Sequence, residues 1–187
     1  MDADRAGAGV HWRGALYLLT IQEFKTDFQK IICVSGPSKL DTVTEFSVNP
    51  ENIDVILNGI DIETFKPDTS VGVIKNRIVT TASADIPLKG LRFLINALPR
   101  VISDFPDTHL VVIGKSPNES KIRKLIADLG LKERISFESN LSEEEIVSIY
   151  HKSQIAVIPS LYEGFGFGAG EAMACGVPLI STHSGGL

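Results

Sequence analysis

The chain has 187 residues, of which 43% are hydrophobic and 22% are charged, so it can bury a sizeable core and does not belong to the disordered class. Its formal net charge of −5 at pH 7 argues against a general nucleic-acid or membrane-surface binder, because both need basic surfaces. This charge still permits a local cationic pocket for a phosphorylated ligand.

The N-terminal part of the chain has the pattern of an incomplete α/β domain. Apolar residues at helical spacing predict an amphipathic helix over residues 12–29, and residues 30–35 form a short apolar run typical of a buried strand. A second helix is expected from Gly36, because Ser35 can cap it and Pro37 suits its first turn. Another strand is expected over residues 52–57, ended by an Asn-Gly turn.

After an irregular stretch from residue 60 to 75, strands and helices alternate to the end of the chain. The expected strands span residues 77–83, 109–114, 134–139, 154–160 and 178–182, and the expected helices span residues 89–103, 119–129, 142–152 and 169–175. Strands that are apolar on both faces and alternate with helices indicate a parallel sheet covered on both sides. The predicted fold class is therefore α/β, a Rossmann-like parallel sheet with helices on both faces.

The pattern predicts two domains of unequal completeness. Residues 1–50 are interpreted as the remnant of one domain, residues 51–76 as a connector, and residues 77–187 as the Rossmann-like domain. The chain stops directly after a predicted strand, where the alternation requires another helix, and its first strand lacks enough partners for a sheet. We therefore expect a fragment of a larger two-domain protein, truncated at both ends.

Cysteine usage and the N-terminal residues favour a cytoplasmic protein. Cys33 and Cys175 lie in apolar settings and are expected to be buried, reduced thiols. The apolar run at residues 14–21 is too short to span a bilayer, and the charged residues near the start do not suit a signal peptide.

The first candidate site residue, Lys89, follows the predicted strand at residues 77–83 and starts the next helix. Open parallel sheets bind ligands at the carboxyl ends of their strands, where helix N-termini expose backbone amides. A cation is unfavourable at a helix N-terminus, so a bound anion would resolve the conflict, with Lys89 supplying the charge. The alternative is a solvated surface lysine.

The second candidate segment places Glu163 and Glu171 around alternating glycines. Each glycine disfavours helix by about 1 kcal/mol relative to alanine, so a loop is expected from Glu163 to about Gly168, with Glu171 in the first turn of the next helix. Such a loop brings amides close to a ligand, and carboxylates accept hydrogen bonds from hydroxyls. This chemistry suits a phosphorylated polyol; a tight turn and helix-dipole stabilisation by Glu171 are the structural alternatives.

The remaining features indicate structure more than chemistry. Ser142 and Glu145 predict a capping box, and neither His109 nor His151 has a partner at metal-ligand spacing. The glycine pair at residues 185–186 follows the last strand and gives a weak signal for another phosphate- or sugar-facing loop. No nucleophile elbow, Walker loop, zinc pattern or dinucleotide fingerprint is present.

Four segments in order resemble one family. "EGFGFGAGE" (residues 163–171) looks like a Glu-x7-Glu motif, "EAMACGVPLIST" follows it at the family's spacing, "VILNGIDIETFKP" resembles its interdomain connector and "LKGL" its donor-loop lysine. The family is the nucleotide-sugar-dependent glycosyltransferases of family 4, which have the GT-B fold. The resemblance covers about residues 31–187 and implies that the chain is mainly the C-terminal, donor-binding half of that fold.

The resemblance also implies roles for individual residues. Glu163 would be the catalytic residue that contacts the hydroxyls of the transferred sugar, Glu171 would hold the ribose, and Lys89 would neutralise the diphosphate. The backbone of the intervening loop would line the sugar–diphosphate pocket, through Gly164, Phe165, Gly166 and Phe167. By the same resemblance, the full-length protein would transfer a hexose from a nucleoside-diphosphate sugar with retention, needing no cofactor and no metal, because protein groups stabilise the leaving diphosphate.

Partners and alternatives complete these expectations. The acceptor would be a carbohydrate or lipid-linked molecule, no nucleic acid would bind, and peripheral membrane association of the full-length protein is compatible with the resemblance. The fragment alone is expected to be inactive, and the alternative function is a non-catalytic nucleotide-sugar-binding module. Two departures stand out: residues 82–88 lack the family's usual arginine, and Gly168 replaces a common proline.

Overall fold

The computed structural model describes residues 29–116 and 120–187 of the chain. These residues form two compact units that meet in the sequence between Asn58 and Gly59. The helix predicted over residues 12–29 lies, apart from its last residue, outside the described residues. None of the helices in the described part of the chain is long and apolar enough to cross a membrane.

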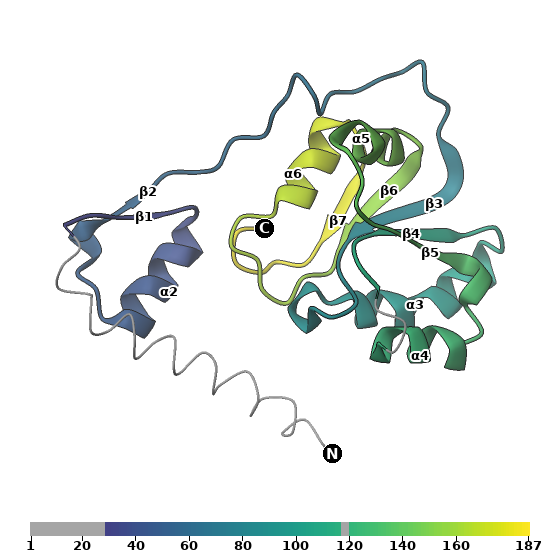
Figure 1. The fold of residues 1–187 in the computed structure, drawn as a ribbon, viewed down its shortest axis with the longest axis horizontal. Coiled ribbons are helices and arrows are strands. Elements are labelled where there is room, and N and C mark those ends of the chain that lie inside the picture. The colour runs from purple at the N-terminus through teal and green to yellow at the C-terminus, as the bar shows by residue number, and fades with distance from the viewer. Residues whose placement is uncertain (1–28, 117–119) are drawn as a thin grey trace. The chain divides into compact units, whose positions relative to one another are not determined.

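The first unit contains a parallel strand–helix–strand motif. Strand β1 (Ile31–Cys33) pairs with β2 (Ile53–Val55), and helix α2 (Gly36–Phe46) connects them (Figure 1). The Ser35 hydroxyl accepts a hydrogen bond of 3.2 Å from the backbone N–H of Ser38, so the predicted N-cap of α2 is confirmed. Parallel pairing requires a crossover of this kind, because a tight turn cannot return the chain to the same end of the sheet.

The second unit contains a five-stranded, entirely parallel sheet with the strand order β5-β4-β3-β6-β7. Its strands are β3 (Ile74–Thr81), β4 (His109–Ile113), β5 (Ile135–Glu138), β6 (Ser153–Ile158) and β7 (Leu179–Ser181). Because all five run in one direction, their carboxyl ends lie along the same edge of the sheet. The predicted Rossmann-like α/β class is confirmed.

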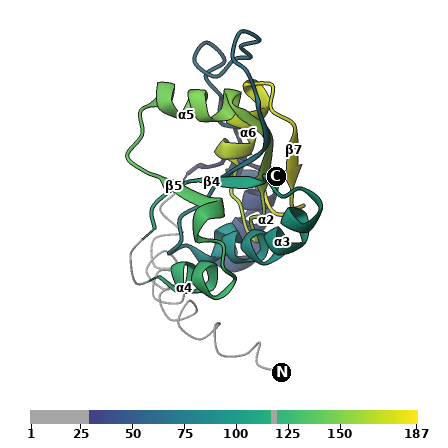
Figure 2. The ribbon, with the colours of Figure 1, turned by 90° about the vertical axis from the view of Figure 1, so that its right-hand side faces the viewer.

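Helices cover both faces of this sheet (Figures 1 and 2). They are α3 (Leu91–Asp104), α4 (Lys121–Asp128), α5 (Glu143–His151) and α6 (Phe167–Ala174). Neighbouring residues of the central strand show the division: Ile78 packs in a cluster with residues of α3 and α4, whereas Val79 packs with Tyr150 of α5 and Ala172 of α6. Each strand therefore buries both of its faces, as its continuous apolar sequence requires.

Local capping signals in the second unit act as expected. The Ser142 hydroxyl accepts from the Glu145 N–H at 3.3 Å, and a Glu145 carboxylate oxygen accepts from the Ser142 N–H at 2.7 Å. This confirms the capping box of α5. Gly130 follows the end of α4 with φ of 67°, a backbone conformation that glycine adopts without steric cost.

The boundary between the two units falls inside the predicted connector, residues 51–76. The predicted division of the chain into domains stays a prediction. Strand β2 lies inside the predicted connector, but it pairs with β1 and so belongs to the first unit. Between Gly59 and Val73 the chain contains turns and no regular helix or strand. Phe65 of this stretch is buried in the second unit, in the cluster of α5 and α6.

Helix α6 begins earlier than predicted. It starts at Phe167, with Gly166 as its N-cap, so Gly168 lies inside the helix and Glu171 lies in its second turn. The prediction that Glu171 occupies the first turn was wrong, and so was the helix-dipole alternative that depended on it. Close packing explains the helical glycines: a Cβ at Gly168 would lie 2.0 Å from Thr81 Oγ1, and one at Gly170 would lie 2.8 Å from Ile60 Cδ1.

Candidate functional site

A cavity of about 310 Å³ lies at the carboxyl ends of the strands of the second unit. Thr81, Ile113 and Ile158, the last residues of β3, β4 and β6, form its base. Its other lining residues come from the segment after β3 and from the segment around the start of α6: Ala82, Ser83, Ile86, Lys89, Glu163, Phe167, Gly168 and Glu171. The three charged side chains predicted to act in one site therefore converge on one cavity.

Lys89 and Glu163 form an ion pair in this cavity. The Lys89 Nζ atom lies 2.7 Å from Glu163 Oε2, and the two side chains are 32% and 14% exposed. The Ser160 hydroxyl donates a second hydrogen bond, of 3.2 Å, to the same carboxylate oxygen. Lys89 belongs to a 3-10 turn (Pro87–Lys89) that precedes α3, so it lies just before the helix and not in it. We expected an anion beside Lys89, and in the structure the carboxylate of Glu163 takes that place.

Two close backbone approaches bring this ion pair together. Gly90 has φ of 68°, and a Cβ there would lie 1.8 Å from the Pro159 carbonyl oxygen. The Leu161 N–H donates to the Leu88 carbonyl at 2.7 Å, so the segments before α3 and after β6 are joined directly beside the pair. Only glycine fits at position 90, because any side chain would separate these two segments.

The C-terminal segment supports the loop that carries Glu163. Gly185 has φ of 57°, and a Cβ there would lie 2.0 Å from the Glu163 carbonyl oxygen. The Ser184 hydroxyl donates to the Ser160 carbonyl at 2.8 Å, and the Thr182 hydroxyl donates to the same oxygen. The glycine pair at residues 185–186 was expected to form a ligand-facing loop; Gly185 packs behind Glu163, and a contact of this pair with a ligand stays a prediction.

The second glutamate, Glu171, is held by a residue that the sequence analysis did not identify. The Tyr150 hydroxyl, at the end of α5, donates a hydrogen bond of 3.1 Å to Glu171 Oε2. Burial, and to a smaller degree the charge of Glu143, raises the pKa of Glu171, while the hydrogen bond from Tyr150 opposes that rise. Burial, followed by the charge of Glu171, raises the pKa of Tyr150 above its ordinary value and that of Cys175 to about 11.

The glycine-rich loop contributes to the site mainly through its backbone. Gly166 has φ of 94° and turns the chain into α6, whose first N–H groups have no acceptor within the helix. Such a helix start favours an anion. Phe167 lines the cavity, whereas Gly164, Phe165 and Gly166 build the turn beside it; the Phe165 and Phe167 rings pack with centroids 5.0 Å apart.

Sequence reasoning missed Tyr150, Ser160 and Thr81 for different reasons. Ser160 and Thr81 lie at strand ends on the ligand side of the sheet, so their positions alone could have identified them. The signal for Tyr150 was weaker: it lies on the buried side of an amphipathic helix, where a phenol needs a partner for its hydroxyl. That partner, Glu171, lies on another helix and could not be inferred from spacing.

Only one cation lines the cavity among the residues that the structure describes. That cation is Lys89, so no described side chain in the cavity replaces the arginine that the resemblance led us to expect. Lys115 lies beside the same loop, since its N–H donates to Ser83 Oγ at 3.2 Å and its carbonyl accepts from Ala84 at 2.9 Å. Its side chain is exposed and does not line the cavity.

Within residues 29–116 and 120–187, no group of three or more His, Cys, Asp or Glu side chains is placed to hold a metal ion. The two cysteines are unpaired and buried, as the sequence analysis expected. The Cys33 thiol is 3.5 Å from the Thr42 hydroxyl in the first unit, whereas Cys175 packs in the cluster of α5 and α6.

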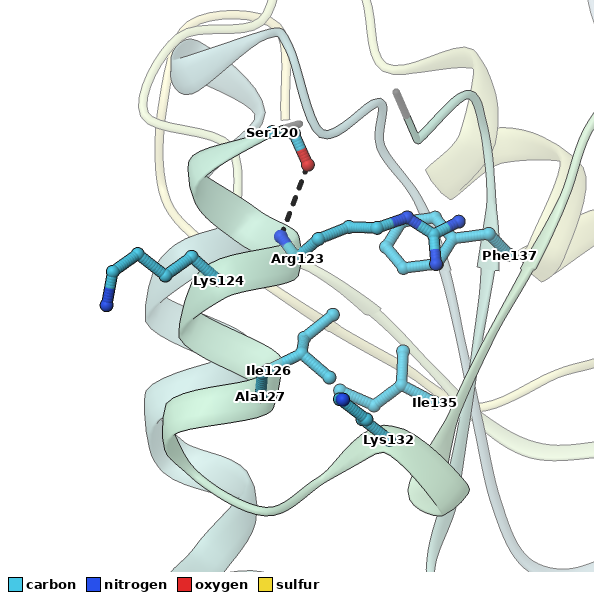
Figure 3. Close-up of a pocket in the computed structure, with 8 residues that line it drawn as sticks. All are labelled: Ser120, Arg123, Lys124, Ile126, Ala127, Lys132, Ile135 and Phe137. Atoms are coloured by element: carbon cyan, nitrogen blue, oxygen red, sulfur yellow. Dashed lines mark hydrogen bonds between the residues drawn. The ribbon is translucent and has the colours of Figure 1, made fainter. Parts of the chain in front are cut away.

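A second cavity, of about 590 Å³, lies between α4 and β5 (Figure 3). Arg123 lies over the Phe137 ring at 5.4 Å, and Ser120 caps the helix by accepting from the Arg123 N–H at 3.2 Å. Arg123, Lys124 and Lys132 line it without any carboxylate, but it includes none of the predicted site residues. The smaller cavity is therefore the candidate site, because it combines charges of both signs with the strand ends.

Comparison with known proteins gives one family for most of the chain. The family model described as "Glycosyl transferases group 1" matches residues 67–187. Among curated proteins, the chain is 39% identical over 158 residues to the MMP alpha-(1->4)-mannosyltransferase of Mycolicibacterium hassiacum, covering 84% of this chain and 38% of that protein. It is 27% identical over 183 residues to the D-inositol 3-phosphate glycosyltransferase of Corynebacterium kroppenstedtii, covering 89% of this chain and 41% of that protein. The chain thus spans under half the length of these relatives.

Solved structures with the same fold include several glycosyltransferases. The chain matches Anabaena Alr3699/HepE in complex with UDP and glucose with a TM-score of 0.71 and 25% identity, covering 84% of this chain and 45% of that chain. It matches a glycosyltransferase from Rickettsia africae with a TM-score of 0.72 and 22% identity, covering 88% of this chain and 49% of that one, which shows the shared fold.

Proposed function

Because this chain belongs to the glycosyl transferases group 1 family, we propose that the protein carrying it transfers a hexose from a nucleoside-diphosphate sugar to an acceptor, with retention of anomeric configuration. One observation carries the proposal: Lys89, Glu163 and Glu171 line a single cavity at the carboxyl ends of the strands, next to the start of α6. The mannosyltransferase relative and the neighbour bound to UDP and glucose support it.

In this proposal the cavity receives the donor. The ammonium of Lys89 and the first amides of α6 hold the diphosphate and stabilise the negative charge that develops as it leaves, with Phe167 in the wall of the cavity and Gly164, Phe165 and Gly166 in the turn beside it. Glu163 is the catalytic residue that contacts the hydroxyls of the sugar, and Glu171 accepts hydrogen bonds from the ribose. The assignment of the chain to glycosyltransferase family 4, within this broader group, is part of the same proposal.

The ion pair defines what donor binding changes. With Lys89 and Glu163 2.7 Å apart, both charges are satisfied by each other before a donor is present. An incoming diphosphate competes with Glu163 for Lys89, and the sugar hydroxyls then supply Glu163 with new hydrogen-bond donors. Binding thus exchanges one ion pair for two sets of charge-assisted hydrogen bonds, which are the stronger class of hydrogen bond.

Further parts of the proposal concern the setting of the reaction. We infer that these residues bind donor, while transfer to a carbohydrate or lipid-linked acceptor needs parts of the longer relatives that the chain does not match. We also infer that the reaction proceeds without a metal or cofactor, in the cytoplasm, with the full-length protein at most peripherally associated with a membrane.

Donor binding tests the proposal directly. Calorimetric titration of the protein with UDP- and GDP-sugars should show binding of at least one donor, weakened about tenfold or more in Lys89→Ala and in Glu171→Ala. Lys124→Ala is the matched control, because it removes an equal charge at the other cavity, where Lys124 pairs with Asp128 at 2.6 Å. A folded protein that binds none of these donors would refute the donor site.

Transfer is tested with the intact protein and a panel of carbohydrate and lipid-linked acceptors. The product's anomeric configuration, read by nuclear magnetic resonance, should match that of the donor; an inverted product would contradict the proposed stereochemistry. Donor binding without any transfer or hydrolysis would instead favour a non-catalytic nucleotide-sugar-binding module.

A further inference from the structure

Tyr150 links the two helices that cover one face of the sheet, directly beside the candidate site. The residue is 1% exposed, and its ring packs edge-on against Phe65 with centroids 6.5 Å apart. From the last turn of α5 its hydroxyl reaches α6, where it lies 3.1 Å from Glu171 Oε2 and 3.3 Å from the Gly168 carbonyl oxygen. Both acceptors belong to the part of α6 that lines the cavity.

The hydrogen bond from Tyr150 reaches only one of the two oxygens of the Glu171 carboxylate. A phenol has a single proton to donate, and the charged carboxylate is the stronger and closer of its two acceptors. In the part of the chain that the structure describes, Tyr150 is the one hydrogen-bond donor to this carboxylate. Glu171 Oε2 is therefore held by the protein, and no described residue donates a hydrogen bond to Oε1, while Glu171 itself lines the cavity.

We propose that Tyr150 is a positioning residue that orients the Glu171 carboxylate, and thereby sets how strongly the site distinguishes a ribose from a sugar lacking its hydroxyls. This rests on the proposed function, in which Glu171 binds the ribose of the donor. A half-buried glutamate without this donor would be free to rotate about its terminal bonds, and its charge would lose the hydrogen bond that Tyr150 supplies. Tyr150 prevents both.

The ring and the hydroxyl of Tyr150 have separable effects. The ring fills the buried cluster with Phe65, Val79 and Ala172, and phenylalanine would preserve that packing. The hydroxyl is the group that hydrogen-bonds to Glu171. If the residue served packing alone, Tyr150→Phe would leave ligand binding unchanged, so the variant separates the two roles.

The experiment measures the dissociation constants of UDP and GDP and of their 2′,3′-dideoxy forms with the intact protein. In the wild type, the better nucleotide should bind about tenfold or more tightly than its dideoxy form, which lacks the hydroxyls that Glu171 accepts from. In Tyr150→Phe this ratio should fall several-fold, chiefly because the ribose nucleotide binds less tightly.

Two further variants keep the interpretation clear. In a Glu171→Ala background, Tyr150→Phe should have no additional effect on the ratio, because the tyrosine acts through the carboxylate. Phe65→Leu disturbs the same cluster but keeps the hydroxyl, so it should lower the melting temperature without changing the ratio. The melting temperature of each variant shows whether it is folded.

The outcomes distinguish the inference from the function on which it rests. Absence of nucleotide binding by the folded wild type would overturn the proposed function itself. Binding of UDP or GDP with the same ratio in wild type and Tyr150→Phe would overturn the inference alone. Equal affinity of the wild type for a nucleotide and its dideoxy form would also overturn it, because Glu171 would then not bind the ribose hydroxyls.

Discussion

The Lys89 ammonium lies 2.7 Å from the Glu163 carboxylate, although the two residues are 74 positions apart in the chain. Both are partly buried, so their attraction is screened by water less than that of a surface pair. In the proposed function the Lys89 ammonium binds the diphosphate. While Lys89 is paired with Glu163, a diphosphate must displace that carboxylate to bind. The affinity of the cavity for an anion therefore depends on Glu163 as well as on Lys89.

Glu163→Gln should separate binding of the diphosphate from transfer of the sugar. A neutral amide cannot hold Lys89 as an ion pair, so UDP or GDP should bind at least as tightly as to the wild type. The rate of transfer should fall by on the order of 100-fold, because the charge at the sugar is lost. Calorimetry with the nucleoside diphosphate and a transfer assay with the intact protein measure the two effects.

Lys89→Ala provides the comparison for Glu163→Gln, since loss of the ammonium should weaken nucleoside-diphosphate binding about tenfold or more. If Glu163→Gln reduced the affinity as much as Lys89→Ala does, the two residues would act as one structural unit. The proposed exchange of partners would then be incorrect.

Glu171→Gln should stabilise the protein at neutral pH. Burial raises the pKa of Glu171 in the folded state, so the folded protein keeps this proton to higher pH than the unfolded chain does. Stability then falls as pH rises from the ordinary carboxyl pKa through the folded-state value, and the loss persists above it. Glutamine removes this loss and can still accept a hydrogen bond from Tyr150.

The melting temperature measured from about pH 4 to about pH 8 tests this sign. The advantage of Glu171→Gln should grow with rising pH through the window above the ordinary carboxyl pKa and then level off. Glu133→Gln, at an exposed position, is the control and should show no comparable gain. A Glu171→Gln variant that is less stable than the wild type at neutral pH would contradict the prediction.

Gly90→Ala should cost more stability than Gly130→Ala, although the two glycines have almost the same φ, 68° and 67°. The left-handed conformation costs any alanine about 1–2 kcal/mol. At position 130 a Cβ meets nothing within 4 Å, but at position 90 it would lie 1.8 Å from the Pro159 carbonyl oxygen. The additional overlap should add about 1–3 kcal/mol.

Urea unfolding of both variants measures the difference. Equal losses would mean that the segments before α3 and after β6 can separate freely, and the close approach beside Lys89 would not matter for stability. A larger loss in Gly90→Ala, accompanied by weaker nucleotide binding, would show that this approach also aligns the ion pair.

Gly168→Ala should destabilise the protein by about 1–3 kcal/mol, because the added Cβ would lie 2.0 Å from Thr81 Oγ1. In a Thr81→Ala background the cost should be smaller, since the hydroxyl and methyl groups nearest to the new atom are gone. A double-mutant cycle from chemical unfolding gives the coupling. Additive losses would show that Thr81 is not the obstacle to a side chain at position 168.

Much of the fold could be predicted from the sequence because its signals are local. Ser35 caps α2 and Ser142 forms a capping box with Glu145, each within three residues of its partner. The apolar strands and the alternation with helices were likewise visible, since each depends on neighbours along the chain. The site residues Lys89, Glu163 and Glu171 could be named because they belong to recognisable motifs at the ends of predicted strands.

The relationships within the site could not be predicted, because they join residues that are distant in the chain. The strand order β5-β4-β3-β6-β7 places the ends of β3 and β6 side by side, and this brings the segment of Lys89 to that of Glu163. Packing of α5 against α6 brings the Tyr150 hydroxyl to Glu171 in the same way. No spacing in the sequence encodes either contact.

The glycine-rich segment shows the difference most clearly. Its glycines alone showed that the segment between Glu163 and Glu171 disfavours a helix. From this we predicted a loop that extends to about Gly168. In the tertiary structure the helix starts at Phe167, and its glycines pack closely: a Cβ at Gly168 would lie 2.0 Å from Thr81 Oγ1, and one at Gly170 would lie 2.8 Å from the end of the Ile60 side chain. The intrinsic cost of glycine in a helix is offset there by this close packing, most of all at Gly168.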